Sequence, residues 1–250
     1  MSELNEQLIP SEPLSDRIPK SLAVVLEELW TKHTGQENSG HYGDNQPYRN
    51  LAPQVGLTLE HLVKIGKLQP IASIFDPQGR LISTASKEAL KTAFLDGKLL
   101  HGLSVFVLGG TEGRIFAEMG AQTINLNDNY LKISPSDVSN LQELSEPLEF
   151  NFVFQHKEEF DLTFSSRVFD SGSGMAWNML GYENYFRMLL EMTKQGGLAI
   201  HHGDQMGKMT NEVTKYLDCK VIEIAPVNKS DLETNFFPTV YVIQKGFNSN

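Results

Sequence analysis

Apolar residues in the first hundred positions recur mainly at the period of a helix. The pattern predicts a helix over residues 21–33, with an apolar face formed by Leu22, Val25, Leu26 and Leu29. Two more helices are predicted over 57–68 and 86–97, the second between a capping Ser86 and a terminating Gly97. Residues 34–56 are rich in Gly, Asn, Gln and Pro, which predicts an extended loop.

Residues 71–83 hold two short strand-like runs. The runs flank Asp76-Pro77-Gln78-Gly79, a sequence typical of a turn because Pro stands at its second position.

From residue 103 onward, strand-like runs alternate with helical segments. Helices are predicted over 111–120, 184–197 and 206–217, and strands are predicted over 103–110, 121–127, 149–154, 160–169, 198–203, 219–226 and 239–246. The alternation predicts crossover units in a mainly parallel sheet. A long polar connection joins the last two strands, so we expect these two to pair antiparallel at one edge.

Composition narrows the classes of partner and compartment. The formal net charge is −10 with no block of Lys or Arg, which disfavours a nucleic-acid substrate. The single cysteine, Cys219, excludes an intrachain disulfide and suits a reducing compartment. No stretch approaches the roughly 18 apolar residues of a membrane helix, and the N-terminus lacks an apolar signal segment. We therefore expect a soluble, cytoplasmic protein without membrane or nucleic-acid partners.

A glycine-rich loop follows the first strand of this region. The apolar run 105–108 suits a strand buried on both faces, and Gly109-Gly110-Thr111-Glu112-Gly113 leads from it into a helix. Glycines at such a turn let a ligand approach the backbone near the helix N-terminus, where free N–H groups point outward. A tight turn without a ligand explains the same residues.

The order of these elements resembles a class I S-adenosylmethionine-dependent methyltransferase. The most specific pieces are FDLTFSSRVF (160–169), which is similar to the family's fourth strand, and LLEMTKQGGLAI (189–200), which is similar to its entry into strand five. The resemblance covers residues 100–246. It implies a Rossmann-like, mainly parallel seven-stranded sheet with a terminal antiparallel pair over 100–250. A mostly helical cap is then expected over 21–99, after a mobile tail or arm over 1–20.

The resemblance implies S-adenosylmethionine as cofactor, in a site formed by Gly109, Gly110, Thr111, Gly113, Asn127 and Ser165. The loop departs from the family pattern at Val107, where an acidic residue is usual, and at Thr111, where a glycine is usual. Asn127 replaces the acidic residue that holds the ribose hydroxyls. If Glu112 points outward it favours the helix dipole, whereas if it points inward it repels the cofactor's carboxylate.

A nicotinamide-cofactor interpretation fits less well. It requires the pattern GxGxxG, which Gly110, Glu112 and Arg114 interrupt.

Polar residues follow the fourth and fifth strands, where ligands of open α/β sheets bind. We expect His202 to act as a general base oriented by Asp204, because successive strand residues face opposite sides and only one of His201 and His202 enters a given pocket. Arg167 either binds an anionic substrate group or pairs with Asp170 or Asp161. These residues do not assure three convergent ligands, so no metal is expected.

Two segments are candidates for covering the site. One is the loop 170–182, and the other is the N-terminal loop with His41, Tyr42, Asp44, Tyr48 and Arg49.

Two classes of function remain at this point. The first is methyl transfer to a small molecule. The alternative is a catalytically silent methyltransferase-like module that acts as a binding or regulatory partner, or a cofactor-binding enzyme of other chemistry. The sequence leaves open a homodimer or another protein partner.

Overall fold

The computed structural model describes residues 13–34, 47–109, 112–126, 138–144, 148–166, 181–203, 218–227 and 239–246. Its helices are α1 (Leu14–Arg17), α2 (Lys20–Thr34), α3 (Pro47–Lys64), α4 (Lys87–Leu95), α5 (Gly113–Glu118), α6 (Phe150–Gln155) and α7 (Tyr182–Met192). Its strands are β1 (Ser104–Leu108), β2 (Gln122–Leu126), β3 (Leu141–Leu144), β4 (Phe160–Ser165), β5 (Thr193–Gly203), β6 (Cys219–Pro226) and β7 (Thr239–Lys245). None of the helices described is long and apolar enough to cross a membrane.

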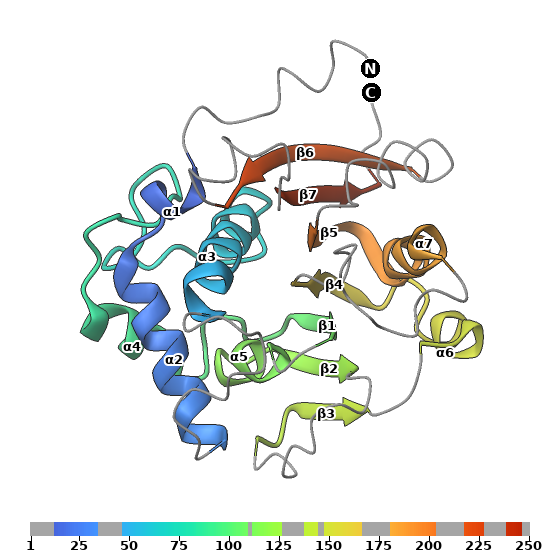
Figure 1. Cartoon of the computed structure of the whole chain (residues 1–250), viewed down its shortest axis with the longest axis horizontal. Helices are drawn as coiled ribbons and strands as arrows, with labels where there is room; N and C mark the ends of the chain where they lie inside the picture. The colour runs from blue at the N-terminus through green and yellow to red at the C-terminus, as the bar shows by residue number, and fades with distance from the viewer. Residues whose placement is uncertain are drawn as a thin grey trace.

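The seven strands form one sheet in the order β3-β2-β1-β4-β5-β7-β6. All pairs from β3 to β5 are parallel, and β7 pairs antiparallel with both β5 and β6. This arrangement confirms the predicted fold class, a Rossmann-like sheet that is mainly parallel and ends in an antiparallel pair (Figure 1).

Helices cover both faces of the sheet. The first five helices lie on one side of the strands, and α6 and α7 lie on the other (Figure 1). Residues of β1 alternate between the two buried clusters, with Val107 packed toward the first group and Phe106 toward the second. Both faces of β1 are fully buried, as expected for its unbroken apolar run.

The segment before α2 lies on the body of the protein. Leu14 is fully buried, and the Ser15 N–H donates to the Val227 carbonyl at 2.9 Å. Arg17 forms ion pairs with Glu60 of α3 and Glu223 of β6. Residues 13–18 therefore form an arm on the domain, and the first twelve positions of the expected tail lie outside the described residues.

The expected loop over residues 34–56 is wrong for its last ten positions, which form the first half of α3. Leu51 and Val55 are buried there, so the apolar period of the helix begins earlier than composition indicated. A Cβ on Gly56 would lie 2.8 Å from the Ile18 side chain, so this glycine lets α1 approach α3 closely. The helix ends at Lys64 rather than at residue 68.

Two of the short-range predictions are confirmed. The Ser86 hydroxyl caps α4 by accepting from the Ala89 N–H at 3.1 Å. In the turn after Phe75, the Asp76 carboxylate accepts from the backbone N–H groups of Gln78 and Arg80, and Phe75 bridges to Leu81.

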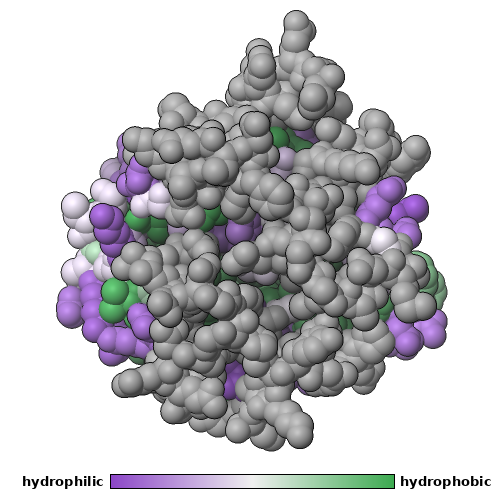
Figure 2. Space-filling view, in the orientation of Figure 1, coloured by the Kyte–Doolittle hydropathy of each residue, from purple (hydrophilic) through white to green (hydrophobic). Residues whose placement is uncertain are grey.

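The predicted strand over 149–154 is wrong, because this segment is helix α6. Its alternating phenylalanines imitate a strand, yet Phe150 and Phe154 lie one turn apart and are 64% and 83% exposed. They account for exposed hydrophobic surface over α6, at the right of Figure 2. The third strand is instead β3, in a stretch where no strand was expected.

The predicted helix over 184–197 also ends early. Helix α7 stops at Met192 and β5 begins at Thr193, with a register irregularity opposite Phe160 and Leu162. The helix predicted over 206–217 lies outside the described residues.

Candidate functional site

Five parallel strands, β1 to β5, end at one edge of the sheet. In the sheet, β2 and β3 lie on one side of β1, whereas β4 and β5 lie on its other side. The direction in which successive strands are added therefore reverses at β1. In open α/β sheets the crevice at this reversal, beyond the carboxyl ends of the strands, is where ligands bind. Gly109, Ser165 and Gly203 mark the ends of β1, β4 and β5 at this edge.

The glycine loop requires glycine at both of its ends. Gly109 has φ of 83°, and its N–H donates to the Leu126 carbonyl of β2 at 2.8 Å. At Gly113, the first residue of α5, a Cβ would lie 2.5 Å from the Cβ of Asn125. Both residues keep α5 and its N-terminus close to the ends of β1 and β2.

Glu112 is buried, with 7% of its surface exposed. The alternative in which Glu112 points outward into solvent is therefore wrong. Gly110, Thr111 and Asn127, the other loop and strand-two residues of the predicted cofactor site, lie outside the described residues.

A partly buried ion pair lies beside the glycine loop. The Arg114 guanidinium of α5 donates through Nε and Nη2 to the two carboxylate oxygens of Glu143 at 3.1 and 3.0 Å. Glu143 lies opposite Asn125 in the β2–β3 register. This bidentate pair ties α5 to the edge strand and was not predicted from the sequence.

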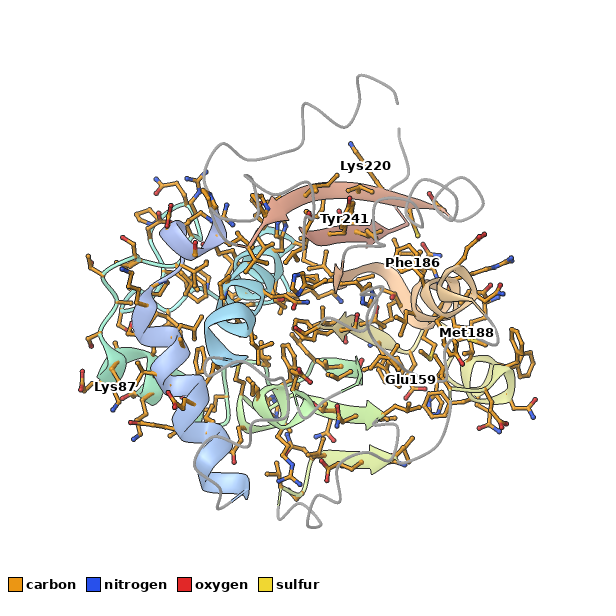
Figure 3. The ribbon with its side chains drawn as sticks, viewed as in Figure 1. Lys87, Glu159, Phe186, Met188, Lys220 and Tyr241 are labelled. Carbon is orange, nitrogen blue, oxygen red and sulfur yellow. The ribbon has the colours of Figure 1, made fainter. Side chains whose placement is uncertain are left out.

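Ser165 and His201 form a buried pair between β4 and β5. The Ser165 Oγ and the His201 Nδ1 lie 2.8 Å apart, and the two residues are opposite each other in register. The His201 ring meets Phe186 of α7 edge to face at 5.7 Å, and Figure 3 shows Phe186 on α7 beside β5. Burial lowers the pKa of His201 to about 3, so this imidazole is neutral near pH 7.

His202 lies on the opposite face of β5 from His201. Because strand residues alternate, it shares its face with Ile200, which packs in the cluster with the first five helices. His202 is buried, as is His201. Asp204 and Arg167, the other predicted catalytic residues, lie outside the described residues.

Gln54 of α3 reaches the same edge of the sheet and was missed in the sequence. Its Nε2 donates to the Ser165 carbonyl at 2.7 Å and approaches the Ile200 carbonyl at 3.5 Å. The residue is fully buried. A polar residue between the apolar positions Leu51 and Val55 was the only local signal for it.

Asp161 lies at the other end of β4, away from these groups. Its carboxylate binds Lys67 at 2.7 Å and Lys194 at 2.9 Å, and accepts from the backbone N–H and hydroxyl of Ser104. Burial alone would raise the pKa of Asp161, but these partners outweigh it and hold the pKa well below its usual range.

Within the described ranges, no three His, Cys, Asp or Glu side chains come together as a metal site.

No protein-family model matches the sequence, and no curated protein sequence matches it. Solved structures do resemble the chain. One is a protein of Streptococcus mutans described as an S-adenosylmethionine-dependent methyltransferase, with 14% identity and a TM-score of 0.43 over 63% of this chain. Another is SMU.776, described as a methyltransferase in complex with S-adenosylhomocysteine, with 16% identity, a TM-score of 0.43 and coverage of 63% of this chain.

The match spans 48% of the length of each of these two proteins. A third structure is the precorrin-6y C5,15-methyltransferase of Geobacter metallireducens, with 14% identity and a TM-score of 0.37 over 71% of this chain and 94% of that one. All three are methyltransferases by description, the class of protein that the sequence motifs resemble, and each TM-score lies below 0.5.

Proposed function

We propose that this chain binds S-adenosylmethionine at the β1–α5 loop and transfers its methyl group to a small molecule. The observation that carries the proposal is the pair of obligatory glycines, Gly109 and Gly113, at the point where the strand order reverses. Glycine at Gly109 leaves this turn without a side chain at the point where the strand order reverses, so a ligand can lie against the backbone there.

Two described residues support cofactor binding at this loop. Gly109 keeps the turn free of a side chain, and Gly113 brings the N-terminus of α5 against β2. Gly110, Thr111, Asn127 and Ser165 remain the other proposed contacts. S-adenosylmethionine, when bound, supplies an electrophilic methyl group on a sulfonium.

The polar residues after β4 and β5 are proposed to position the acceptor. His202 is the proposed general base, with Asp204 orienting it and Arg167 binding an anionic group of the acceptor. His201 is proposed to hold Ser165 in place rather than to accept a proton, because its Nδ1 already meets the Ser165 hydroxyl and burial keeps it neutral.

A small acceptor is favoured by the burial of this region. Gln54, Ser165, His201 and His202 are each at most 2% exposed. Reacting groups of a macromolecule would need these side chains near the surface, whereas a small molecule can be enclosed by them. The net charge of −10 also disfavours a nucleic-acid acceptor.

One observation favours a second function. Glu112, the residue that precedes α5, is buried in the segment that would receive the carboxylate of the cofactor. A carboxylate turned toward the cofactor there would repel it, which would favour a module that keeps the fold as a binding surface without catalysis.

Calorimetry distinguishes these functions. The purified chain is titrated with S-adenosylmethionine and S-adenosylhomocysteine, beside Gly109→Asp and the matched control Gly102→Asp. The two glycines flank β1 and have nearly equal positive φ of 83° and 86°, so both substitutions place the same charged side chain at a position that favours glycine. Gly109 is buried and Gly102 is exposed, so thermal unfolding is measured to show that both variants are folded. Only Gly109 lies at the proposed site.

Methyl transfer requires binding in the micromolar range that Gly109→Asp abolishes and Gly102→Asp retains. Absence of binding at millimolar ligand would refute the enzyme and favour the silent module. Glu112→Gln separates the two further, since tighter binding by this variant would show that the carboxylate opposes the cofactor.

A further inference from the structure

We propose that Gln54 determines substrate specificity, with its side-chain carbonyl accepting a hydrogen bond from a hydroxyl or amino group of the substrate. The inference rests on the proposed methyl transfer and deepens it by naming a chemical feature that the acceptor must carry.

The orientation of the Gln54 amide follows from its contacts. The Ser165 carbonyl can only accept, so the Gln54 group that meets it at 2.7 Å must be the NH₂ group. The Oε1 atom therefore lies on the other side of the amide carbon. It is buried, and no hydrogen-bond partner for it exists in the part of the chain that the structure describes.

A buried carbonyl oxygen without a partner is uncommon in folded proteins. Removing such a group from water costs its full desolvation, and nearly all buried acceptors are therefore paired with protein or ordered water. Polar groups left without a protein partner are expected where a ligand supplies the missing partner, and a carbonyl oxygen can pair only with a donor.

Gln54 lies where an acceptor molecule would be bound. Its amide spans the carbonyls of Ser165, the last residue of β4, and Ile200, two residues before His202 in β5. Ile200 and His202 share the face of β5 that the first five helices cover. Gln54 and His202, the proposed base, therefore lie near each other at β4 and β5. The β1–α5 loop follows β1, which is the neighbour of β4 on its other side.

Gln54 also couples the N-terminal region to the sheet. The backbone carbonyl of Gln54 accepts from the Thr58 hydroxyl at 2.8 Å, and Thr58 is equally buried one turn later in α3. Thr58 offers a matched control, because its hydroxyl is a buried polar group of the same helix. In the described contacts, this hydroxyl touches neither β4 nor the side chain of Gln54.

The test uses phenol and anisole as probes, because phenol carries an O–H donor, whereas anisole, in which a methyl group replaces that hydrogen, carries none. Both are titrated by NMR into protein saturated with S-adenosylhomocysteine. We expect phenol to bind the natural sequence about tenfold more tightly than anisole, the effect of one neutral hydrogen bond. The preference should vanish in Gln54→Met and persist in Thr58→Val.

Equal affinity for the two probes, a preference that survives in Gln54→Met, or no binding of either probe would overturn the inference. Thermal unfolding shows whether each variant is folded. Gln54→Asn replaces Gln54→Met if the latter is not, since its shorter side chain withdraws the carbonyl while keeping an amide.

The phenol and anisole titration is repeated without S-adenosylhomocysteine and read beside the calorimetry, which separates the two proposals. Absence of S-adenosylhomocysteine binding in the calorimetry, with a phenol preference that persists in the ligand-free protein, would refute methyl transfer but not the role of Gln54 as a hydrogen-bond acceptor. Binding of S-adenosylhomocysteine without a phenol preference would do the reverse.

Discussion

Gly113 in α5 lies so close to Asn125 in β2 that a Cβ on the glycine would be 2.5 Å from the Cβ of the asparagine. Alanine normally stabilises a helix relative to glycine by about 1 kcal/mol, yet the overlap here outweighs this gain. We expect Gly113→Ala to lower the free energy of unfolding by about 1–3 kcal/mol, as overpacking does. Urea unfolding measures this change.

A double-mutant cycle with Asn125→Gly provides the control. Removing the Asn125 side chain frees the space, so the two substitutions together should cost less than the sum of their separate costs. Additive costs would show that the contact between α5 and β2 does not require glycine.

Asp161 at the amino edge of the sheet is expected to stabilise the fold in its charged form. Asp161→Asn weakens two charge-assisted contacts of a buried carboxylate, to the half-exposed Lys67 and Lys194, and should cost about 1–2 kcal/mol near pH 7. Because the pKa is lowered in the folded state, the contribution is present above the ordinary value of 3.8 and is lost as pH falls through the lower folded value. Urea unfolding at several pH values measures both effects.

Glu28→Gln is the matched control for this prediction. Glu28 also bridges two lysines, Lys87 and Lys91, but it does so at the surface. Solvent screens that contact, so its loss should have a much smaller effect. An equal effect of the two substitutions would contradict the role of burial at Asp161.

Glu223 is expected to make stability depend on pH in the acid range. Burial alone would raise its pKa, but the hydrogen bond from His61 and the charges of Arg17 and Lys64 lower the pKa to about 2. Its contribution is therefore present above pH 4.5 and is lost as pH falls toward 2. Glu223→Gln should be less stable than the natural sequence near neutral pH and should show a flatter stability profile between pH 4.5 and 2.

Glu60, in the same cluster, is expected to behave with the opposite sign. Burial raises the pKa of Glu60 despite Arg17 and the Leu81 N–H, so the folded state favours its protonated form more than the unfolded chain does. Glu60→Gln, which imitates that form, should cost less at neutral pH than Glu223→Gln. A larger cost would contradict this assignment. Chemical denaturation across pH compares the two.

His201 is expected to remain neutral in the folded protein across the physiological range. Burial lowers its pKa to about 3, whereas the unfolded chain binds a proton below about 6.5. Its contribution to stability therefore falls as pH decreases from about 6.5 toward 3. Correlation of the ring nitrogens by NMR, with His201→Gln for assignment, should show no titration of this ring between pH 4.5 and 8. Titration near pH 6 would exclude the neutral buried pair with Ser165.

Much of the sheet could be predicted from local pattern. The apolar runs of β1, β4 and β5 are long, and the antiparallel β6 and β7 follow from their alternating residues and polar connection. The alternation that separated His201 from His202 needs only the geometry of a strand. The glycine loop was visible because its residues are contiguous.

Local pattern failed where packing decides which side of an element is buried. Alternating phenylalanines predicted a strand over 149–154, but the segment is a helix that packs through Val153 and leaves Phe150 and Phe154 exposed. The polar composition of residues 47–56 predicted a loop, but the segment is helical. Its Gly56 packs against the side chain of Ile18.

The sequence by itself determined the types of most elements and the residue types available at the ends of β1, β4 and β5, because these depend on neighbours along the chain. Only the tertiary structure decided that Gln54 meets Ser165, 111 positions later, that Arg114 pairs with Glu143, and that Glu112 is buried. Such contacts depend on how distant elements pack around a shared core, which no local period of apolar and polar residues encodes.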